Sequence, residues 1–392
     1  MRLPLGVIIT AALLVSTLIA CATIRATIPA DYTPEHQASP RSALTQGTAE
    51  LTSVFPDAVA TSTTTATAET SPAQRPSGEY ASLFPSVSAD GRFVVFTTNS
   101  PAILGEGAPS CNTGEEEFRL CFQIVRYDVR SGEFRVVSAS ASGELANRDS
   151  HLTRRAVSAD GERVVFTSSA DNLTENTHPD SHIFLNDLKA NKIYNLTNPV
   201  MPALAGASQH ASLSADGGYV VFQSTARYLS NAQAQDTWNV YLYEVSTGAY
   251  TLVSQGSRKP DDFGYSLEPA ISSNGRWVAF WSWAGLVEAD DSPCAKTGEV
   301  LEPCGDVYRY DVQTGGFARF VVGEGLGKGS GDLGETFISS SGRWILAGDL
   351  LIDMEQNVSA NLQVTLGQTT CGAVLSQSAD AILCRSHTAA KI

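Results

Sequence analysis

The stretch SADGRFVVF at residues 88–96 decides the fold, because the chain contains it several times. Near copies begin at Ser158, Ser214 and Ser272, and two more divergent copies begin at Ser339 and Ser376. A unit that recurs in this way cannot bury its apolar face alone, so the repetition predicts an array of packed units.

Each full copy places Asp-Gly, or the close variant Asn-Gly, between apolar residues. This dipeptide favours a hairpin, since Gly accepts the positive φ of the turn and Asp hydrogen-bonds to its own backbone. The turn residues are Asp90, Gly91, Asp160, Gly161, Asp216, Gly217, Asn274 and Gly275. The strand after the turn is apolar on both faces, which predicts a strand in the middle of a sheet with neighbours on both sides.

A second pair of apolar runs follows each of the first five copies, and the turn between the two runs ends in Gly or Asn. These turns are residues 128–132, 187–191, 244–248, 311–315 and 353–357. Gly and Asn share a tolerance of the left-handed region, so this position is a backbone requirement and not a chemical site. One repeat is therefore four antiparallel strands, and the predicted fold is an all-β propeller of four-stranded blades.

We expect six blades, because the sixth copy supplies two strands before residue 392. Closing the ring would then require a strand from the N-terminal segment, for example around residues 49–55. Five blades with an extra C-terminal hairpin are the alternative.

The N-terminus has the pattern of an export signal. After Arg2 comes a run without charged residues, and residues 18–21 read LIAC. Such a segment indicates a secretion signal, and LIAC resembles the bacterial lipobox, which implies a diacylglyceryl group on Cys21. Ordinary secretion and a retained anchor are the alternatives. We therefore expect a signal peptide at residues 1–21 and a protein anchored by lipid in the bacterial envelope, at the cell surface or in the periplasm.

Residues 22–78 are rich in Thr, Ser, Ala and Pro and contain few bulky apolar residues. Such a composition cannot bury enough apolar surface to offset the entropy of ordering, so we expect a disordered tether. The propeller domain then occupies residues 79–392.

Besides Cys21, the chain has six cysteines that fall into local pairs. The pairs are Cys111 with Cys121, Cys294 with Cys304, and Cys371 with Cys384. The first two pairs share one spacing and lie in equivalent insertions between the second and third strands of repeats one and four. The third pair is symmetric about a predicted turn, so its members would face each other across a hairpin. Export to an oxidising compartment favours three disulfides over reduced core cysteines or a zinc site.

The formal net charge of −15 comes from 41 acidic and 26 basic residues, without a basic cluster in the folded part. Nucleic acid and anionic lipid surfaces are bound through Lys and Arg, so both are excluded as main partners. We expect a monomer that binds an envelope protein, a glycan or a small molecule.

Several segments resemble catalytic or metal sites without completing the pattern. The glycine-rich residues 323–331 lack the Ser or Thr of a phosphate loop. His178 and His182 could ligate a metal from a loop, but a solvated loop explains them better. The acidic residues 115–117 and 288–291 lack the ligand spacing of a committed calcium loop, so we expect no cofactor, with Ca²⁺ as the weaker alternative.

Binding is instead expected at the rim formed by the loops between second and third strands and between blades, because loops on a rigid scaffold carry function. Its candidate residues are Glu116, Phe118, Arg119, Trp281, Trp283, Lys296 and Lys328, although most of the tryptophan cluster is expected to be core.

The rival reading is a glycan-active enzyme with two carboxylates at the centre of the ring. Only Glu268 and Glu335 stand near inner-strand positions, so we assign no catalytic residues.

The repeated signature, with VRYDVRSG at 125–132 and TSSADNL at 167–173, resembles the TolB-type, WD-repeat-like β-propeller family of bacterial envelope proteins. The resemblance covers nearly all of residues 84–386. It implies a scaffold that binds proteins or ligands, or in some members the gating domain of a peptidase. Residues 22–77 do not resemble the α/β domain that precedes the propeller in TolB, and we expect no hydrolase domain.

Overall fold

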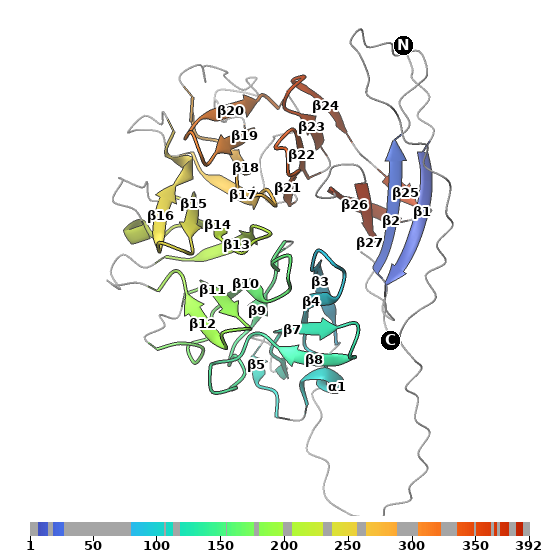
Figure 1. Ribbon diagram of the computed structural model, residues 1–392, viewed down its shortest axis with the longest axis vertical. Coiled ribbons are helices and arrows are strands. Elements are labelled where there is room, and N and C mark those ends of the chain that lie inside the picture. The colour runs from blue at the N-terminus through green and yellow to red at the C-terminus, as the bar shows by residue number, and fades with distance from the viewer. Residues whose placement is uncertain are drawn as a thin grey trace, which may run out of the picture. The chain divides into compact units, whose positions relative to one another are not determined.

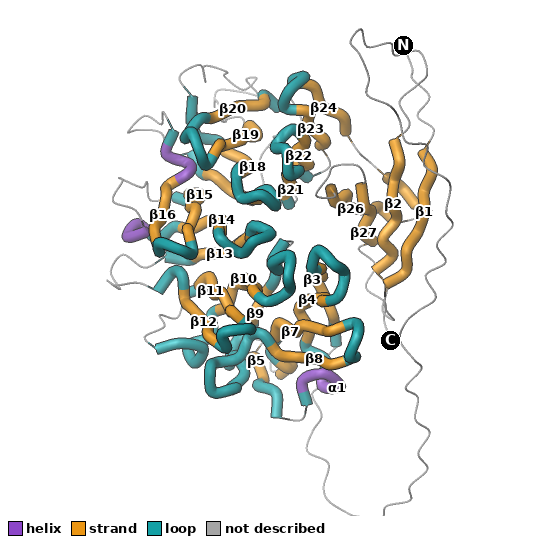
Figure 2. The backbone as a smooth tube through the Cα atoms, in the orientation of Figure 1, coloured by secondary structure: helices purple, strands orange, loops and turns teal. Residues whose placement is uncertain are grey.

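The computed structural model describes two compact units, residues 72–361 and residues 1–71 with 362–392. Within them the structure describes residues 7–14, 19–26, 80–105, 107–112, 118–153, 155–175, 180–198, 206–229, 237–256, 264–287, 305–322, 335–348, 350–361, 364–366, 369–375 and 382–386. Strands dominate these residues (Figure 2). The helices among them are α1 (Pro101–Leu104) and two 3₁₀ turns, and none is long and apolar enough to span a membrane.

The larger unit contains five four-stranded antiparallel sheets, each built from consecutive blade strands (Figure 1). The first blade is β3 (Ser82–Val87), β4 (Phe93–Thr98), β7 (Gln123–Asp128) and β8 (Glu133–Val136). The second is β9 (Ser150–His151), β10 (Arg163–Ser168), β11 (His182–Asp187) and β12 (Lys192–Asn195). The third is β13 (Ser208–Leu213), β14 (Tyr219–Ser224), β15 (Asn239–Glu244) and β16 (Ala249–Leu252).

The fourth blade is β17 (Ser266–Ile271), β18 (Trp277–Ser282), β19 (Asp306–Asp311) and β20 (Phe317–Phe320). The fifth is β21 (Thr336–Ile338), β22 (Trp344–Ala347), β23 (Leu350–Asp353) and β24 (Val358–Asn361). A small hairpin of β5 (Ser110–Asn112) and β6 (Phe118–Leu120) lies in the insertion of the first blade. The predicted all-β propeller of four-stranded blades is confirmed.

The core lies where the second and third strands of each blade meet. Phe222 and Phe280 are fully buried and stack on Tyr241 and Tyr308, each with 5.9 Å between ring centroids. The double-sided apolar pattern of the second strand therefore predicts its position correctly. The turns also agree with prediction, since Asn191 and Asn357 take φ values of 51° and 53° at the last turn position.

Neighbouring blades are joined through the turn that follows each signature serine. The ring of Phe93 in the first blade packs directly against Gly161 in the turn of the second. Arg126 lies over that ring, 4.2 Å from its centroid, and donates a 2.8 Å hydrogen bond to the Gly161 carbonyl. Trp277, Arg309 and Gly342 repeat this arrangement between the fourth and fifth blades. Such repeated contacts make these blades a rigid frame.

A sixth sheet lies in the smaller unit and joins the two ends of the chain. It consists of β25 (Val364–Leu366), β26 (Thr369–Leu375) and β27 (Ile382–Ser386) with β1 (Val7–Leu14) and β2 (Ile19–Ala26). The total is consistent with about six blades. N-terminal residues pair with the last strand, but those predicted for this, 49–55, lie outside the described residues. Cys21, in β2, pairs with Arg385, in β27. The removal of a leader and lipidation stay predictions.

Two local features differ from the regular repeat or from its prediction. The inner strand of the second blade is shorter than those of its neighbours, since β9 is Ser150–His151 and is followed by one isolated bridge between Val157 and Val164. Arg155, with a φ of 62°, lies between β9 and this bridge.

The second difference concerns the cysteine pair of the last hairpin. Cys371 lies opposite Ser386 and Cys384 lies opposite Ala373, so the two cysteines are diagonal neighbours and do not face each other directly. Diagonal positions are separated by about 7–8 Å, more than most disulfides span between Cα atoms. A disulfide here would therefore require a shift of the strands.

Candidate functional site

The inner strands of the larger unit carry a repeated irregularity. The innermost strands, among them β3, β13, β17 and β21, lie around the centre of the unit (Figure 1). The pairing of β3, β13 and β17 shifts register next to Phe84, His210 and Glu268, which have φ values of 52°, 57° and 53°. A left-handed residue other than Gly costs about 1–2 kcal/mol, and a bulge redirects its side chain. Large side chains thus occupy these positions despite a conformational cost.

Four charged or titratable residues share this inner-strand region: Arg155, His210, Glu268 and Glu335, which we call the axial cluster. They belong to blades two, three, four and five. Three of them stand four residues before a signature serine, a spacing from which sequence reasoning could have found His210. Glu335 lies directly before β21, as predicted, and Glu268 lies within β17.

His210 and Glu268 form the closest contact within the axial cluster. His210 Nδ1 lies 2.9 Å from Glu268 Oε1, an ion pair when the imidazole is protonated. Burial alone would lower the pKa of His210, but the hydrogen bond and charge of Glu268 and the charge of Glu335 outweigh it and raise the pKa. The pair therefore stabilises the fold fully below the ordinary His pKa, and this contribution is lost as pH rises through the raised value.

The bulge at Glu268 is supported by its neighbouring blade. The Glu268 backbone N–H donates a 2.8 Å hydrogen bond to Gln223 Oε1 of β14. A side chain thus satisfies the donor that the bulge leaves without a strand partner. Glu268 is thus held in place by a backbone contact as well as by charge.

Arg155 connects blades that are not neighbours. Its Nη1 donates a 2.9 Å hydrogen bond to the carbonyl of Ile271 in the fourth blade, while its own carbonyl accepts from Leu213 N–H in the third. Burial lowers the pKa of Arg155 to about 10, so the guanidinium remains charged at neutral pH.

The predicted rim is braced in the insertion of the first blade. The Cys111–Cys121 disulfide is confirmed, with 4.9 Å between Cα atoms. Arg119 pairs with Asp149 at 2.9 and 2.6 Å and lies over the ring of Phe122, 4.6 Å from its centroid. Arg119 is therefore a brace whose guanidinium is already engaged.

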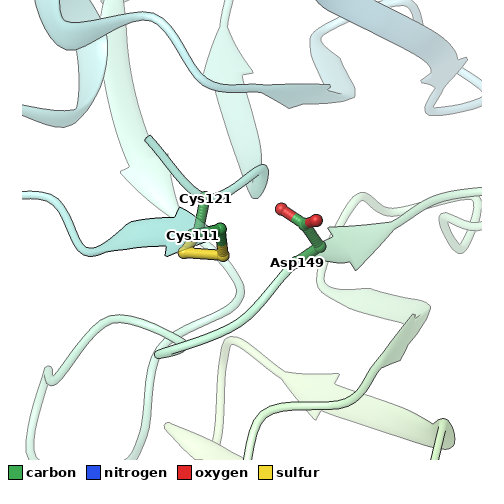
Figure 3. Close-up of side chains that lie close together, drawn as sticks. All are labelled: Cys111, Cys121 and Asp149. Atoms are coloured by element: carbon green, nitrogen blue, oxygen red, sulfur yellow. A yellow bond between two sulfur atoms is a disulfide. The ribbon is translucent and has the colours of Figure 1, made fainter. Parts of the chain in front are cut away.

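Asp149 points towards the disulfide (Figure 3). Among the described residues, the sulfurs of Cys111 and Cys121 and a carboxylate oxygen of Asp149 are one set of metal-type ligand atoms lying within 4.8 Å of one another. The sulfurs are bonded to each other, and Asp149 also accepts from Phe122 N–H at 2.8 Å. This group is thus a structural contact in the oxidised protein. Because both sulfurs form the disulfide, neither is a thiolate that could bind a metal.

The remaining rim candidates lie in the core, in β6 or outside the described residues. Trp281 and Trp283 are only 3% and 9% exposed, so both belong to the core. Tyr265, which sequence reasoning missed, packs on Trp283 with 4.6 Å between ring centroids and is 39% exposed. Phe118 lies in β6. The predicted residues outside the described ranges are Glu116, Lys296, Lys328, Cys294, Cys304 and the segments 115–117, 288–291 and 323–331.

His182 is not in a loop. It is fully buried at the start of β11, where Nδ1 lies 2.8 Å from the Thr197 carbonyl. It therefore serves as a core histidine and is not available as a loop ligand for a metal. His178, the other histidine of the predicted loop site, lies outside the described residues.

Comparison with known proteins gave only structural likenesses, since no family model matches and no curated protein matches. TolB from Acinetobacter baumannii is 15% identical with a TM-score of 0.41, covering 79% of this chain and 55% of TolB. Dipeptidyl peptidase 4 from Porphyromonas gingivalis is 11% identical with a TM-score of 0.40, and the match covers 74% of this chain and 43% of the peptidase. Oligogalacturonate lyase from Vibrio parahaemolyticus is 9% identical with a TM-score of 0.33, and the match covers 78% of this chain and 89% of the lyase. The chain thus matches only about half of TolB, and no function follows from these similarities.

Proposed function

We propose that this chain is an extracytoplasmic lipoprotein, akin to the TolB-type propellers, whose blades form a non-catalytic scaffold for binding. The observation that carries the proposal is the bracing of the first insertion by the Cys111–Cys121 disulfide and the Arg119–Asp149 pair. Ordering a loop before it meets a partner lowers the entropic cost of binding. The partner is an envelope protein, a glycan or a small molecule, and the acidic net charge argues against nucleic acid.

The anchor predicts a specific modification. In a bacterial host with a lipoprotein pathway, the wild-type chain should enter the membrane fraction and begin at a Cys21 that carries acyl chains. Cys21→Ser should remove the acyl mass and release the chain or leave its leader uncut, whereas Ala22→Ser should behave as wild type. Membrane fractionation and mass spectrometry of the N-terminal peptide test this. A mature chain that begins elsewhere, without acyl groups, would contradict it.

The binding face is tested by two surface positions with matched exposure. Tyr265 is 39% exposed at the rim, and Val129 is 40% exposed on the turn between β7 and β8, at the opposite end of the blades. A photo-crosslinking amino acid at each position, in intact cells of the source organism, should trap one reproducible protein partner from Tyr265 and none from Val129. Capture from Val129 alone would place the binding face on the opposite side and refute the rim.

A second function is favoured by the axial cluster. Glu268 and Glu335 are carboxylates on adjacent blades, and the charges of both raise the pKa of His210. If neither crosslinking position captures a protein, the purified chain should be assayed for cleavage of envelope polysaccharides. Turnover that Glu268→Gln abolishes would establish the enzyme, and absence of turnover together with binding would leave a glycan or small-molecule scaffold.

A further inference from the structure

Arg155 differs from several other arginines of the blades, because each of them contacts a carboxylate or an aromatic ring. In four blades an arginine pairs with the aspartate that opens the turn between the third and fourth strands: Arg92 with Asp128, Arg163 with Asp187, Arg276 with Asp311 and Arg343 with Asp353. Arg126 and Arg309 instead stack on aromatic rings. Each of these cations has a charge or a π-face to stabilise it.

The guanidinium of Arg155 is only partly hydrogen-bonded. Nη1 donates to the Ile271 carbonyl at 2.9 Å, while Nη2 is buried and makes no hydrogen bond to any residue that the structure describes. Burial is the cause of its lowered pKa, and no carboxylate among the described residues opposes that effect. An enclosed cation without a counter-charge is costly, because a neutral carbonyl replaces only part of its hydration.

The surroundings of Arg155 favour an anion. Arg155 reaches past the end of β13 to Ile271, the last residue of β17, whereas His210 and Glu268 lie three residues nearer the starts of these strands. The negative charge of Glu268 is offset by His210, 2.9 Å away. Glu268 is therefore engaged at a different level of the strands, and among the described residues no carboxylate forms an ion pair with Arg155.

We propose that Arg155 binds the oxyanion of a small ligand, a carboxylate or a phosphate group, among the inner strands of the second, third and fourth blades. The two N–H groups of Nη2 would donate to the oxyanion, while the bond from Nη1 to Ile271 holds the guanidinium in place. This site is separate from the rim, so its failure would leave the rim proposal untouched, and the reverse also holds.

Thermal unfolding of the full-length protein in different anions tests the proposal. Acetate and phosphate should each be titrated at fixed pH and ionic strength, with chloride as the reference salt. Binding to the native state alone stabilises it in proportion to ln(1 + [L]/Kd), so the preferred anion should raise Tm by a few degrees in a saturable way. The more effective anion identifies the ligand group as carboxylate or phosphate.

Two variants test whether Arg155 is the residue that causes the anion-dependent rise in Tm. Arg155→Met keeps most of the aliphatic length and should abolish the anion-dependent rise in Tm. Arg309→Met also removes an arginine that donates to a carbonyl of another blade, Gly342, and should retain the rise. A wild-type protein with no difference among the salts would overturn the proposal even if Arg155→Met does not fold. An equal rise in wild type and Arg155→Met would overturn it as well, since the anion would then act elsewhere.

Discussion

Asp306→Ala is expected to destabilise the fourth blade more than any other single loss of charge in the described residues. Asp306 accepts from Arg319 Nε at 2.6 Å and from Val322 N–H at 3.0 Å, and its second contact with Arg319, through Nη2, is 2.5 Å. The side chains of Arg319 and Asp306 are only 10% and 3% exposed. Removing one partner of a buried ion pair leaves an uncompensated charge, at a cost of about 3–5 kcal/mol.

Urea unfolding would measure this loss as a lower transition midpoint. The double variant Asp306→Ala/Arg319→Met should recover part of the stability, because it leaves no buried cation behind. Asp128→Ala is the matched control, since its partner Arg92 is 39% exposed and water can replace the aspartate. An Asp306→Ala midpoint equal to that of Asp128→Ala would show that the buried pair is not what holds β19 to the end of β20.

Strands and turns of this protein could be predicted from the sequence because they depend on local patterns. The apolar second strand and the left-handed turn residues, such as Asn191, require no knowledge of distant contacts. The Arg92–Asp128 pair could not be found in this way. It depends on the register of β4 against β7, in which Phe93 lies opposite Asp128, and no short motif specifies that register.

The candidate site was only partly predictable for the same reason. Glu268 and Glu335 stood out as inner-strand carboxylates, but His210 was not recognised as a partner of Glu268. Their meeting depends on bulges at equivalent positions of β13 and β17, and a bulge is a backbone irregularity without a fixed residue type. Arg155 was missed because the second blade departs from the repeat at that point.

The contact between the first two blades predicts a second large effect. Phe93 is 5% exposed, and the guanidinium groups of Arg92 and Arg126 lie 4.6 and 4.2 Å from its ring centroid. Phe93→Ala removes the ring and both cation–π contacts and should cost about 3–5 kcal/mol. Phe134→Ala, at a ring that is 46% exposed, should cost far less and serves as its control.

Gly161 makes this contact testable from the other side. A Cβ at Gly161 would lie 2.2 Å from Phe93 Cδ2, whereas a Cβ at Gly91, which has nearly the same φ, would meet nothing within 4 Å. Both Gly→Ala changes carry the left-handed cost of about 1–2 kcal/mol, but only Gly161→Ala also forces the blades apart.

A double-mutant cycle separates the two costs of Gly161→Ala. In the Phe93→Ala background only the 2.9 Å contact with the Phe93 Cβ remains of the three closest ones, so Gly161→Ala should then cost little more than Gly91→Ala. The expected coupling energy is about 1–3 kcal/mol, read from urea unfolding of the four proteins. Additive losses would mean that the ring moves aside freely. The blades would then be held together by the backbone bond from Ala89 N–H to the Ala159 carbonyl and by Arg126, and not by the packing of Phe93.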